Sequence, residues 1–414
     1  MSTDTVKITP LSNKDSLLVV KGLKLNFFTY AGVVKALDGV SFMIKQDETL
    51  GIVGETGCGK SITAHSILRL VRHPGRILEG TIHFRSKYTG GKWKNLLDMS
   101  DKQMREIRGH HISMIFQDPM TYLNPVFKIS NQLKESILLH QDLKEEAVLV
   151  QIEEVESKLE QLELQEELSP EQKNEQEQLL AKLRDLEEQL KNPPVPTKKQ
   201  RHAAAYWKSI QVLRLVRMPD PANALDSYPF ELSGGMRQRV MIALALASTP
   251  DLLIADEATT ALDVTIQAQI LNLMGDLREK LKTTLVLITH DLGIVAEQCE
   301  RVIVMYAGNI IEDASTIDLF KHPAHPYTEG LLAAIPKLEQ EHLAIIPGTV
   351  PNLIYPPDGC RFHPRCPLRE DICEKEKPML SRVGENHYVA CHVRGTSDYV
   401  EVEVPADQIE EDKQ

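Results

Sequence analysis

The chain has 414 residues, and 59 Asp and Glu against 47 Lys and Arg give it a formal net charge of −12 at pH 7. Its length allows two or three domains, and its 42% hydrophobic content is typical of a globular protein with an ample core. The acidic balance argues against a nucleic-acid partner. The sequence contains no apolar run long enough to span a bilayer and no secretory signal at its start, so we expect a cytoplasmic location.

Residues 16–45 alternate apolar and polar side chains and are rich in β-branched and aromatic residues. This pattern predicts an antiparallel β-subdomain. Tyr30 falls at a turn inside it. The ring of Tyr30 is a candidate to stack on an adenine base, and an ordinary exposed turn tyrosine is the alternative that the sequence leaves open.

An apolar segment at 50–53 leads into a glycine-rich loop and then into a segment, from Ile62 to Leu70, with helical spacing. The loop reads Gly54-Glu55-Thr56-Gly57-Cys58-Gly59-Lys60-Ser61. A strand, this spacing and a helix together are typical of a P-loop, in which backbone N–H groups and the helix start surround phosphate. We therefore expect residues 54–62 to bind a nucleotide, with Lys60 on its β- and γ-phosphates and Ser61 on Mg²⁺.

A second glycine-punctuated β-rich stretch covers residues 75–97, and a strand predicted at 112–116 ends in Gln117. Residues 118–125 then form a loop broken by prolines. An amide side chain at the end of a strand beside a nucleotide can contact Mg²⁺ or the attacking water. A structural role is the alternative for Gln117.

Residues 142–192 are rich in Glu, Gln, Lys and Leu, and their apolar side chains recur at steps of three and four. Ser169-Pro170 lies between two such runs and is a natural helix start. We interpret this region as an antiparallel helical hairpin, although an exposed charged helix without a special role is also compatible with the pattern.

Three further stretches carry candidate site residues. The small residues Ser233, Gly234 and Gly235 open a helix, so they form a second helix start suited to an anion. A buried strand at 252–255 ends in Asp256 and Glu257, of which one carboxylate can hold Mg²⁺ and the other can orient or deprotonate water. A strand at 285–289 is followed by His290, at the sheet edge where α/β proteins bind ligands.

These motifs occur in the order typical of the ATP-binding-cassette family, which the chain resembles over about residues 8–335. The loop resembles Walker A, Gln117 the Q-loop, Leu232 to Met236 the signature motif, Asp256 and Glu257 Walker B, Thr260 to Asp263 the D-loop, and His290 the switch histidine. Residues 117–125, 325–336 and 346–366 are similar to the oligopeptide/dipeptide importer ATPases. Ala258 departs from the family, which often has proline there.

The resemblance implies an α/β fold: a RecA-like core with an antiparallel β-subdomain and a helical subdomain, here carrying the inserted hairpin. It implies ATP and Mg²⁺ as ligands, with Ser61, Gln117 and Asp256 around the metal and Glu257, His290 and Gln117 in catalysis. The implied partners are a second, related but distinct cassette, two transmembrane permease subunits and an extracytoplasmic peptide-binding protein. Such a subunit would lie on the cytoplasmic face of the cell membrane.

Four cysteines cluster near the C-terminus, at Cys360, Cys366, Cys373 and Cys391. Four thiolates in a proline-rich segment favour a metal clip over disulfides in the cytoplasm. In the importer family this pattern resembles the ligands of a 4Fe-4S cluster, with Zn²⁺ or free cysteines as alternatives. We therefore expect an iron–sulfur site in a C-terminal extension, residues 336–400, followed by an acidic tail, residues 401–414.

Two functions compete with an importer ATPase. Chromosome-associated ATPases also carry coiled coils between Walker A and the signature, although theirs are far longer. A non-enzymatic regulator that uses the cysteine region as a sensor is the other alternative. The complete set of Asp256, Glu257 and His290 favours an active ATPase.

Overall fold

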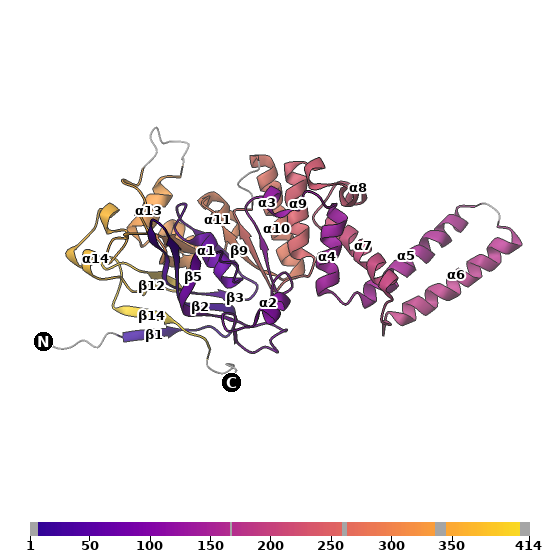
Figure 1. Cartoon of the computed structure of the whole chain (residues 1–414), viewed down its shortest axis with the longest axis horizontal. Coiled ribbons are helices and arrows are strands. Elements are labelled where there is room, and N and C mark those ends of the chain that lie inside the picture. The colour runs from indigo at the N-terminus through magenta and orange to yellow at the C-terminus, as the bar shows by residue number, and fades with distance from the viewer. Residues whose placement is uncertain (1–6, 166–167, 259–262, 336–344, 406–414) are drawn as a thin grey trace. The chain divides into compact units, whose positions relative to one another are not determined.

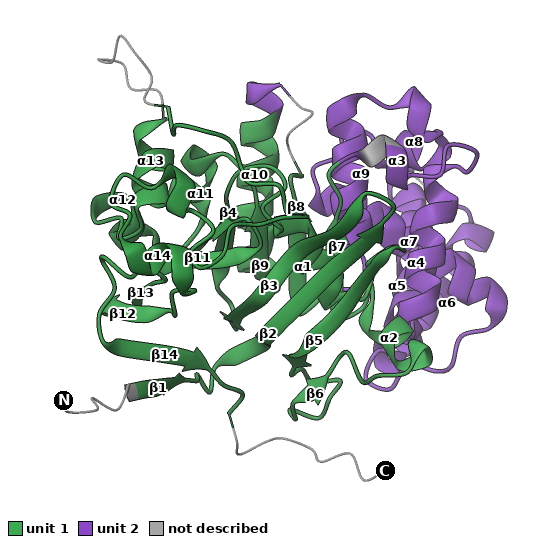
Figure 2. Ribbon diagram, turned by 60° about the vertical axis from the view of Figure 1, so that its left-hand side comes forward, with its two compact units in different colours: residues 1–117, 250–261, 267–414 green, residues 118–249, 262–266 purple. Residues whose placement is uncertain are grey.

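The structure is a computed structural model that describes residues 7–165, 168–258, 263–335 and 345–405. The chain divides into two compact units, shown in green and purple in Figure 2. The first unit contains residues 1–117, 250–261 and 267–414, and the second contains residues 118–249 and 262–266. Thr260, Ala261 and Leu262 of the predicted D-loop lie outside the described residues.

Among the residues that the structure describes, ten strands form the larger sheet of the first unit, in the spatial order β1-β14-β12-β13-β11-β10-β4-β9-β8-β7. They are β1 Lys7–Leu11, β4 Thr49–Val53, β7 Ile112–Ile115, β8 Leu252–Asp256, β9 Thr284–Ile288, β10 Arg301–Tyr306, β11 Asn309–Ser315, β12 Ser381–Gly384, β13 His387–Val389 and β14 Asp398–Val402. Strands β10, β4, β9, β8 and β7 pair in parallel. Their carboxyl ends therefore lie at one edge of the sheet.

The second sheet of this unit has the order β3-β2-β5-β6. Its strands are β2 Ser16–Thr29, β3 Gly32–Lys45, β5 Gly75–Phe84 and β6 Lys94–Asn95. All neighbours pair antiparallel, as the alternating pattern of residues 16–45 predicted. Apolar side chains of β2, β3 and β5 share one buried cluster with apolar side chains of β4, β8 and β9, so the two sheets of this unit enclose a common core.

The described helices of the first unit are α1 Lys60–Ile67, α2 Asp101–Ile107, α11 Leu292–Gln298, α12 Thr316–Lys321, α13 Pro326–Ala333, α14 Asp371–Lys375 and most of α10 Val264–Leu281. The first residues of α10, up to Ile266, belong to the second unit. Each turn from β4 to α1 and from β9 to α11 connects a strand to a helix at the carboxyl edge of the sheet. This edge is where α/β sheets bind ligands.

The second unit is helical over its described residues. It contains α3 Pro119–Tyr122, α4 Ile129–His140, α5 Lys144–Glu163, α6 Pro170–Gln189, α7 Lys198–Leu215, α8 Pro221–Asp226 and α9 Gly234–Leu246. Residues 119–122 thus form a single helical turn inside the segment predicted as a loop. Helix α9 starts at Gly234, within the Ser-Gly-Gly segment predicted to open it, and the Ser233 hydroxyl caps the helix by accepting a hydrogen bond from the Met236 N–H at 3.3 Å.

Figure 1 shows α5 and α6 running side by side. Ser169 caps α6 with a reciprocal bond to Gln172, and Pro170 occupies the first helical turn. A buried seam joins the two helices through Val148, Ile152, Val155 and Leu159 of α5 and Leu186 of α6. Each helix has 20 residues, or about 30 Å.

The C-terminal strands complete the larger sheet. Strand β13 pairs antiparallel with β11, and β14 pairs in parallel with β1. The region between residues 345 and 405 is therefore continuous with the sheet of the first unit.

Candidate functional site

The turn between β4 and α1 requires glycine at two positions. Gly54 has a φ of 149°, and a Cβ there would lie 2.2 Å from the Met305 carbonyl oxygen. Gly59 has a φ of 108°, and its Cβ would lie 2.8 Å from the side chain of Leu37. The backbone at both ends of the loop is thus too tightly packed, and too far into the left-handed region, for any other residue.

Lys60 and Ser61 open α1 and make the first polar contacts of the site. The Lys60 ammonium donates to the carbonyl oxygens of Gly54 at 2.7 Å and Glu55 at 3.2 Å. The Ser61 hydroxyl donates to Asp256 Oδ1 at 2.9 Å, so the end of β8 and the start of α1 present their oxygens together. Burial raises the pKa of the Asp256 carboxyl to about 6, although the Ser61 hydrogen bond opposes this shift.

Three predicted catalytic side chains, from three different strand ends, converge. Gln117 follows β7 and donates to Glu257 Oε2 at 2.7 Å, and His290 Nδ1 lies 3.3 Å from Glu257 Oε1. Glu257 has a φ of 46°, an unusual backbone conformation for a residue other than glycine, and its N–H donates to the Ile288 carbonyl at 2.9 Å. The sheet therefore holds this carboxylate in a strained position, as is common at functional sites.

A cavity of about 310 Å³ opens between these groups and the antiparallel sheet. Its polar lining includes Lys60, Ser61, Gln117 and Glu257. Its apolar lining includes Phe27, Val34, Ala36 and Leu353, which were not singled out from the sequence. An apolar wall beside a polar end is typical of a ligand pocket, and this volume lies at the lower end of the range for such pockets.

Not every predicted residue lies at this cavity. Tyr30 occupies the turn between β2 and β3 and is fully exposed. Ser233, Gly234 and Gly235 belong to the second unit, whereas every residue that lines the cavity belongs to the first. For these four residues, a nucleotide contact stays a prediction.

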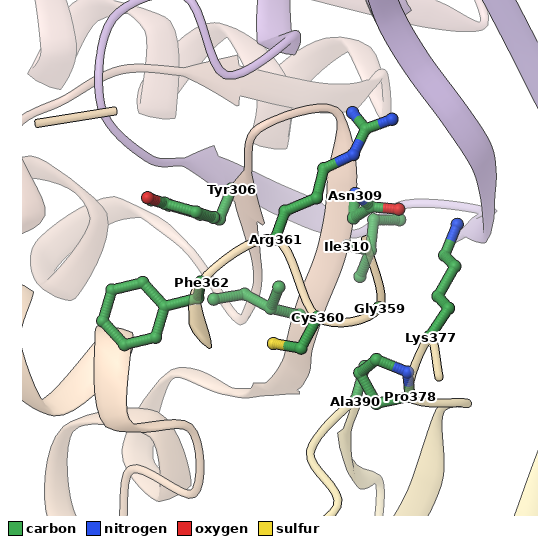
Figure 3. Close-up of a pocket in the computed structure, with 11 residues that line it drawn as sticks. Tyr306, Asn309, Ile310, Gly359, Cys360, Arg361, Phe362, Lys377, Pro378 and Ala390 are labelled. Atoms are coloured by element: carbon green, nitrogen blue, oxygen red, sulfur yellow. The ribbon is translucent and has the colours of Figure 1, made fainter. Parts of the chain in front are cut away.

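The C-terminal region packs on the strand and loop that follow β10. Figure 3 shows Arg361 and Phe362 beside Tyr306, around a much smaller cavity of about 30 Å³. The Arg361 guanidinium donates to the carbonyl oxygens of Ala307 at 2.5 Å and Lys35 at 3.2 Å, and the Phe362 ring meets Tyr306 edge-on at 5.1 Å. That second cavity has room for little more than water, so the candidate site is the cavity lined by Lys60, Ser61, Gln117 and Glu257.

The prediction of an iron–sulfur or zinc site is wrong. Within the described part of the chain, no group of three or more His, Cys, Asp or Glu side chains is placed to hold a metal ion. The four C-terminal cysteines are free, and burial raises the pKa of the Cys360 thiol to about 11 and that of Cys366 above its usual value. The spacing of the cysteines alone did not establish a ligand set.

The residues at the cavity of about 310 Å³ fit a nucleotide and Mg²⁺. Loop residues between Thr56 and Ser61 line this cavity, so the phosphate-binding loop and the start of α1 form one of its walls. Ser61 and Asp256 supply a hydroxyl and a carboxylate oxygen, the hard donors that Mg²⁺ prefers. Together with the strand order, these features define a P-loop nucleotide-binding protein.

Comparison with known proteins shows to which family of P-loop proteins the chain belongs. Residues 37–260 match the ABC transporter family, and residues 311–373 match the C-terminal region of oligopeptide/dipeptide transporters. A probable peptide ABC transporter ATP-binding protein, y4tR of Sinorhizobium fredii, is 44% identical over 91% of this chain and 95% of its own. The dipeptide transport ATP-binding proteins DppD of Bacillus subtilis and Escherichia coli are 40% and 38% identical, each over 91% of this chain and over 94% and 96% of their own.

The fold has solved counterparts. A dimeric post-hydrolysis structure of the ATP-binding cassette MJ0796, bound to ADP and Pi, has a TM-score of 0.51 at 21% identity and covers 72% of this chain and 99% of its own. The chain belongs to the ATP-binding-cassette family, among the oligopeptide/dipeptide transporter ATP-binding proteins. Among its described residues, every helix is too short or too polar to cross a membrane.

Proposed function

We propose that this chain is the ATP-hydrolysing subunit of a membrane importer for oligopeptides or dipeptides. The similar proteins support this proposal, because their names describe peptide and dipeptide transport. The observation that carries the proposal is that Gln117 and Glu257 line the same cavity as the P-loop, with His290 in contact with Glu257. These names give no support to the chromosome-associated alternative.

Each site residue has a role in this proposal. Residues 54–62 surround the phosphates, with Lys60 on the β- and γ-phosphates. Ser61, Gln117 and Asp256 would hold Mg²⁺, which would supply positive charge beside the phosphoryl group. Glu257 orients or deprotonates the attacking water, because its carboxylate is held by the Gln117 amide and has His290 beside it.

The apolar wall of the cavity would receive the base. Phe27, Val34, Ala36 and Leu353 form this wall, and Tyr30 is an additional proposed stacking partner at the adjacent turn. An aromatic or aliphatic face against the base is typical of nucleotide pockets.

The proposal includes partners that complete the reaction. A second, related but distinct cassette would bring its own Ser-Gly-Gly helix start to the γ-phosphate, as Ser233, Gly234 and Gly235 would for the other site. Closure of the two cassettes would then move two transmembrane permease subunits, which receive peptide from an extracytoplasmic binding protein. This arrangement places the chain on the cytoplasmic face of the membrane.

We also propose a division into domains. Residues 8–335 form the ATPase, with an inserted hairpin at 142–192 in its helical subdomain. Residues 336–400 form the C-terminal extension and residues 401–414 an acidic tail, although strand β14, Asp398–Val402, crosses this boundary. Residues 336–344 and 406–414 are outside the described residues.

Glu257→Gln tests the hydrolytic role. The amide keeps the shape of the side chain but cannot accept a proton, so ATP turnover by the assembled transporter should fall by about 100-fold or more while ATP binding is retained. The measurements are phosphate release and equilibrium binding of ATP. Glu279→Gln, on the exposed face of α10, is the matched control and should turn over normally. Normal turnover by the Glu257 variant would contradict the assignment.

A further inference from the structure

An acidic side chain in a phosphate-binding loop needs a physical explanation. Glu55 is the second residue of the loop, and its backbone carbonyl already accepts from Lys60 at 3.2 Å. An unpaired carboxylate there would repel a triphosphate and would compete with it for the Lys60 ammonium. Some group must therefore hold the Glu55 carboxylate in place and offset its charge.

The structure supplies that group from the C-terminal region. Arg365 ends a short 3-10 helix, His363–Arg365, and its guanidinium makes two parallel bonds to Glu55: Nη1 to Oε2 at 2.8 Å and Nη2 to Oε1 at 3.1 Å. The Arg365 side chain is 6% exposed and that of Glu55 is 28% exposed. A bidentate pair in so little solvent is both directional and strong.

Arg365 is itself held from other sides. Its Nε donates to the Pro347 carbonyl at 2.9 Å, and its Nη1 also donates to the Tyr306 hydroxyl at 3.3 Å. The guanidinium lies 5.7 Å from the centre of the Tyr306 ring and 5.9 Å from that of Phe362. The position of Arg365 is thus fixed before any nucleotide arrives.

A second contact from the same region reaches the same loop residue. The Glu55 N–H donates to the Tyr327 hydroxyl at 2.9 Å, and Tyr327 is fully buried at the start of α13. The Tyr327 ring packs 5.4 Å from Phe362 and 4.7 Å from Tyr306. Backbone and side chain of Glu55 are therefore both bound by residues that follow the ATPase motifs in the chain.

We propose that Arg365 is a positioning residue of the nucleotide site, which holds the Glu55 carboxylate away from Lys60 and cancels its charge so that the phosphate loop accepts an anion. The C-terminal region is, on this view, a working part of the P-loop. The inference rests on the proposed ATP site.

A double-mutant cycle on the full chain tests it. Arg365→Met keeps much of the side-chain volume but leaves Glu55 unpaired, so its Kd for ATP, measured by calorimetric titration, should rise at least about tenfold. Adding Glu55→Gln to Arg365→Met removes the stranded charge and should recover most of the lost affinity. The Arg365→Met loss should be larger for ATP than for ADP, because repulsion grows with the charge of the ligand.

Two controls separate this role from folding. Arg382→Met breaks a more exposed pair with Asp398, at 3.7 Å in the same C-terminal region, and should leave the Kd unchanged. Thermal melting reports whether each variant is folded. If Arg365→Met does not fold, Arg365→Lys replaces it: its single ammonium cannot make two parallel bonds, so affinity should fall about threefold and Glu55→Gln should restore it.

The outcomes are distinguishable. A double variant as weak as Arg365→Met, or equal losses for ATP and ADP, would show that Arg365 only packs the C-terminal region and would overturn the inference. An unchanged Kd in folded Arg365→Met would also overturn it. A wild-type chain that binds no ATP would instead contradict the proposed function itself.

Discussion

The carboxylate of Asp256 is buried in the protein without nucleotide or Mg²⁺. It is 5% exposed, and burial raises its pKa to about 6. The unfolded chain would ionise it near pH 4, so the native state binds this proton more tightly. The cost of the buried charge is therefore fully present above pH 6, and it disappears as the pH falls towards 4.

Asp256→Asn should accordingly stabilise the nucleotide-free protein. At pH 7.5 in EDTA, the free energy of unfolding should rise by about 2 kcal/mol, and the difference from wild type should shrink between pH 6 and pH 4. Denaturant unfolding at several pH values measures both effects. Exposed Asp358→Asn is the control, and a stability gain that does not change with pH would rule out this explanation.

Site residues that belong to a local sequence motif could be predicted. Residues that reach the site from a distant part of the sequence could not. Lys60 and Ser61 follow a loop whose spacing determines its shape, and Glu257 follows a strand end that meets Gln117 and His290 in any parallel sheet. Arg365 lies 310 residues from Glu55, and no local pattern links them. Leu353, on the apolar wall of the cavity, was likewise not predicted, because no local pattern links it to the P-loop.

At the scale of single elements, helices α5 and α6 show what the spacing of apolar residues in the sequence can predict. Steps of three and four predicted the apolar stripe that becomes the seam, and Ser169-Pro170 predicted the start of α6. The seam is narrow, since Leu186 is the one residue of α6 that is fully buried among its described side chains. Packing between two such helices stabilises them only modestly.

Leu186→Ala should therefore loosen this pair of helices. Removing a buried leucine side chain costs about 2 to 3 kcal/mol, which is large for a seam of this size. Hydrogen exchange should increase across residues 144–189, whereas the affinity for ATP should stay at the wild-type value. Leu180→Ala, which removes a 41% exposed side chain from the same helix, should change neither. Unchanged exchange in the Leu186 variant would show that other contacts hold the helices.

At the scale of the whole molecule, the C-terminal region belongs to the sheet of the first unit. Strand β13 covers the edge of β11, and buried Glu312 of β11 lies 2.8 Å from His387 of β13. Short strands with few residues, such as β12 and β13, have too little periodicity to be recognised from sequence. The spacing of the cysteines led to the wrong prediction of a metal site. The C-terminal region is instead held by strand pairing and by the contacts of Arg361 and Arg365.

Truncation before residue 377 tests this dependence. It removes β12, β13 and β14 and exposes an unpaired edge on β11, so the product should aggregate. Glu312 loses His387 but keeps the hydrogen bonds that the Ala324 and His325 N–H groups donate to it. Size-exclusion chromatography and thermal melting provide the measurement. A chain ending at residue 405 keeps all three strands and serves as the control. A truncated chain that stayed monodisperse with an unchanged melting temperature would contradict this account.

The pairing of β1 with β14 has a consequence for biosynthesis. Thr9 of β1 donates to Asp398 of β14, a partner that the ribosome adds 389 residues later. At typical elongation rates this is a delay of roughly 20 to 80 s, during which β1 has no strand to join. The edge of the sheet therefore closes only after nearly the whole polypeptide has emerged, and a nascent chain stalled before that point displays its first strand to chaperones.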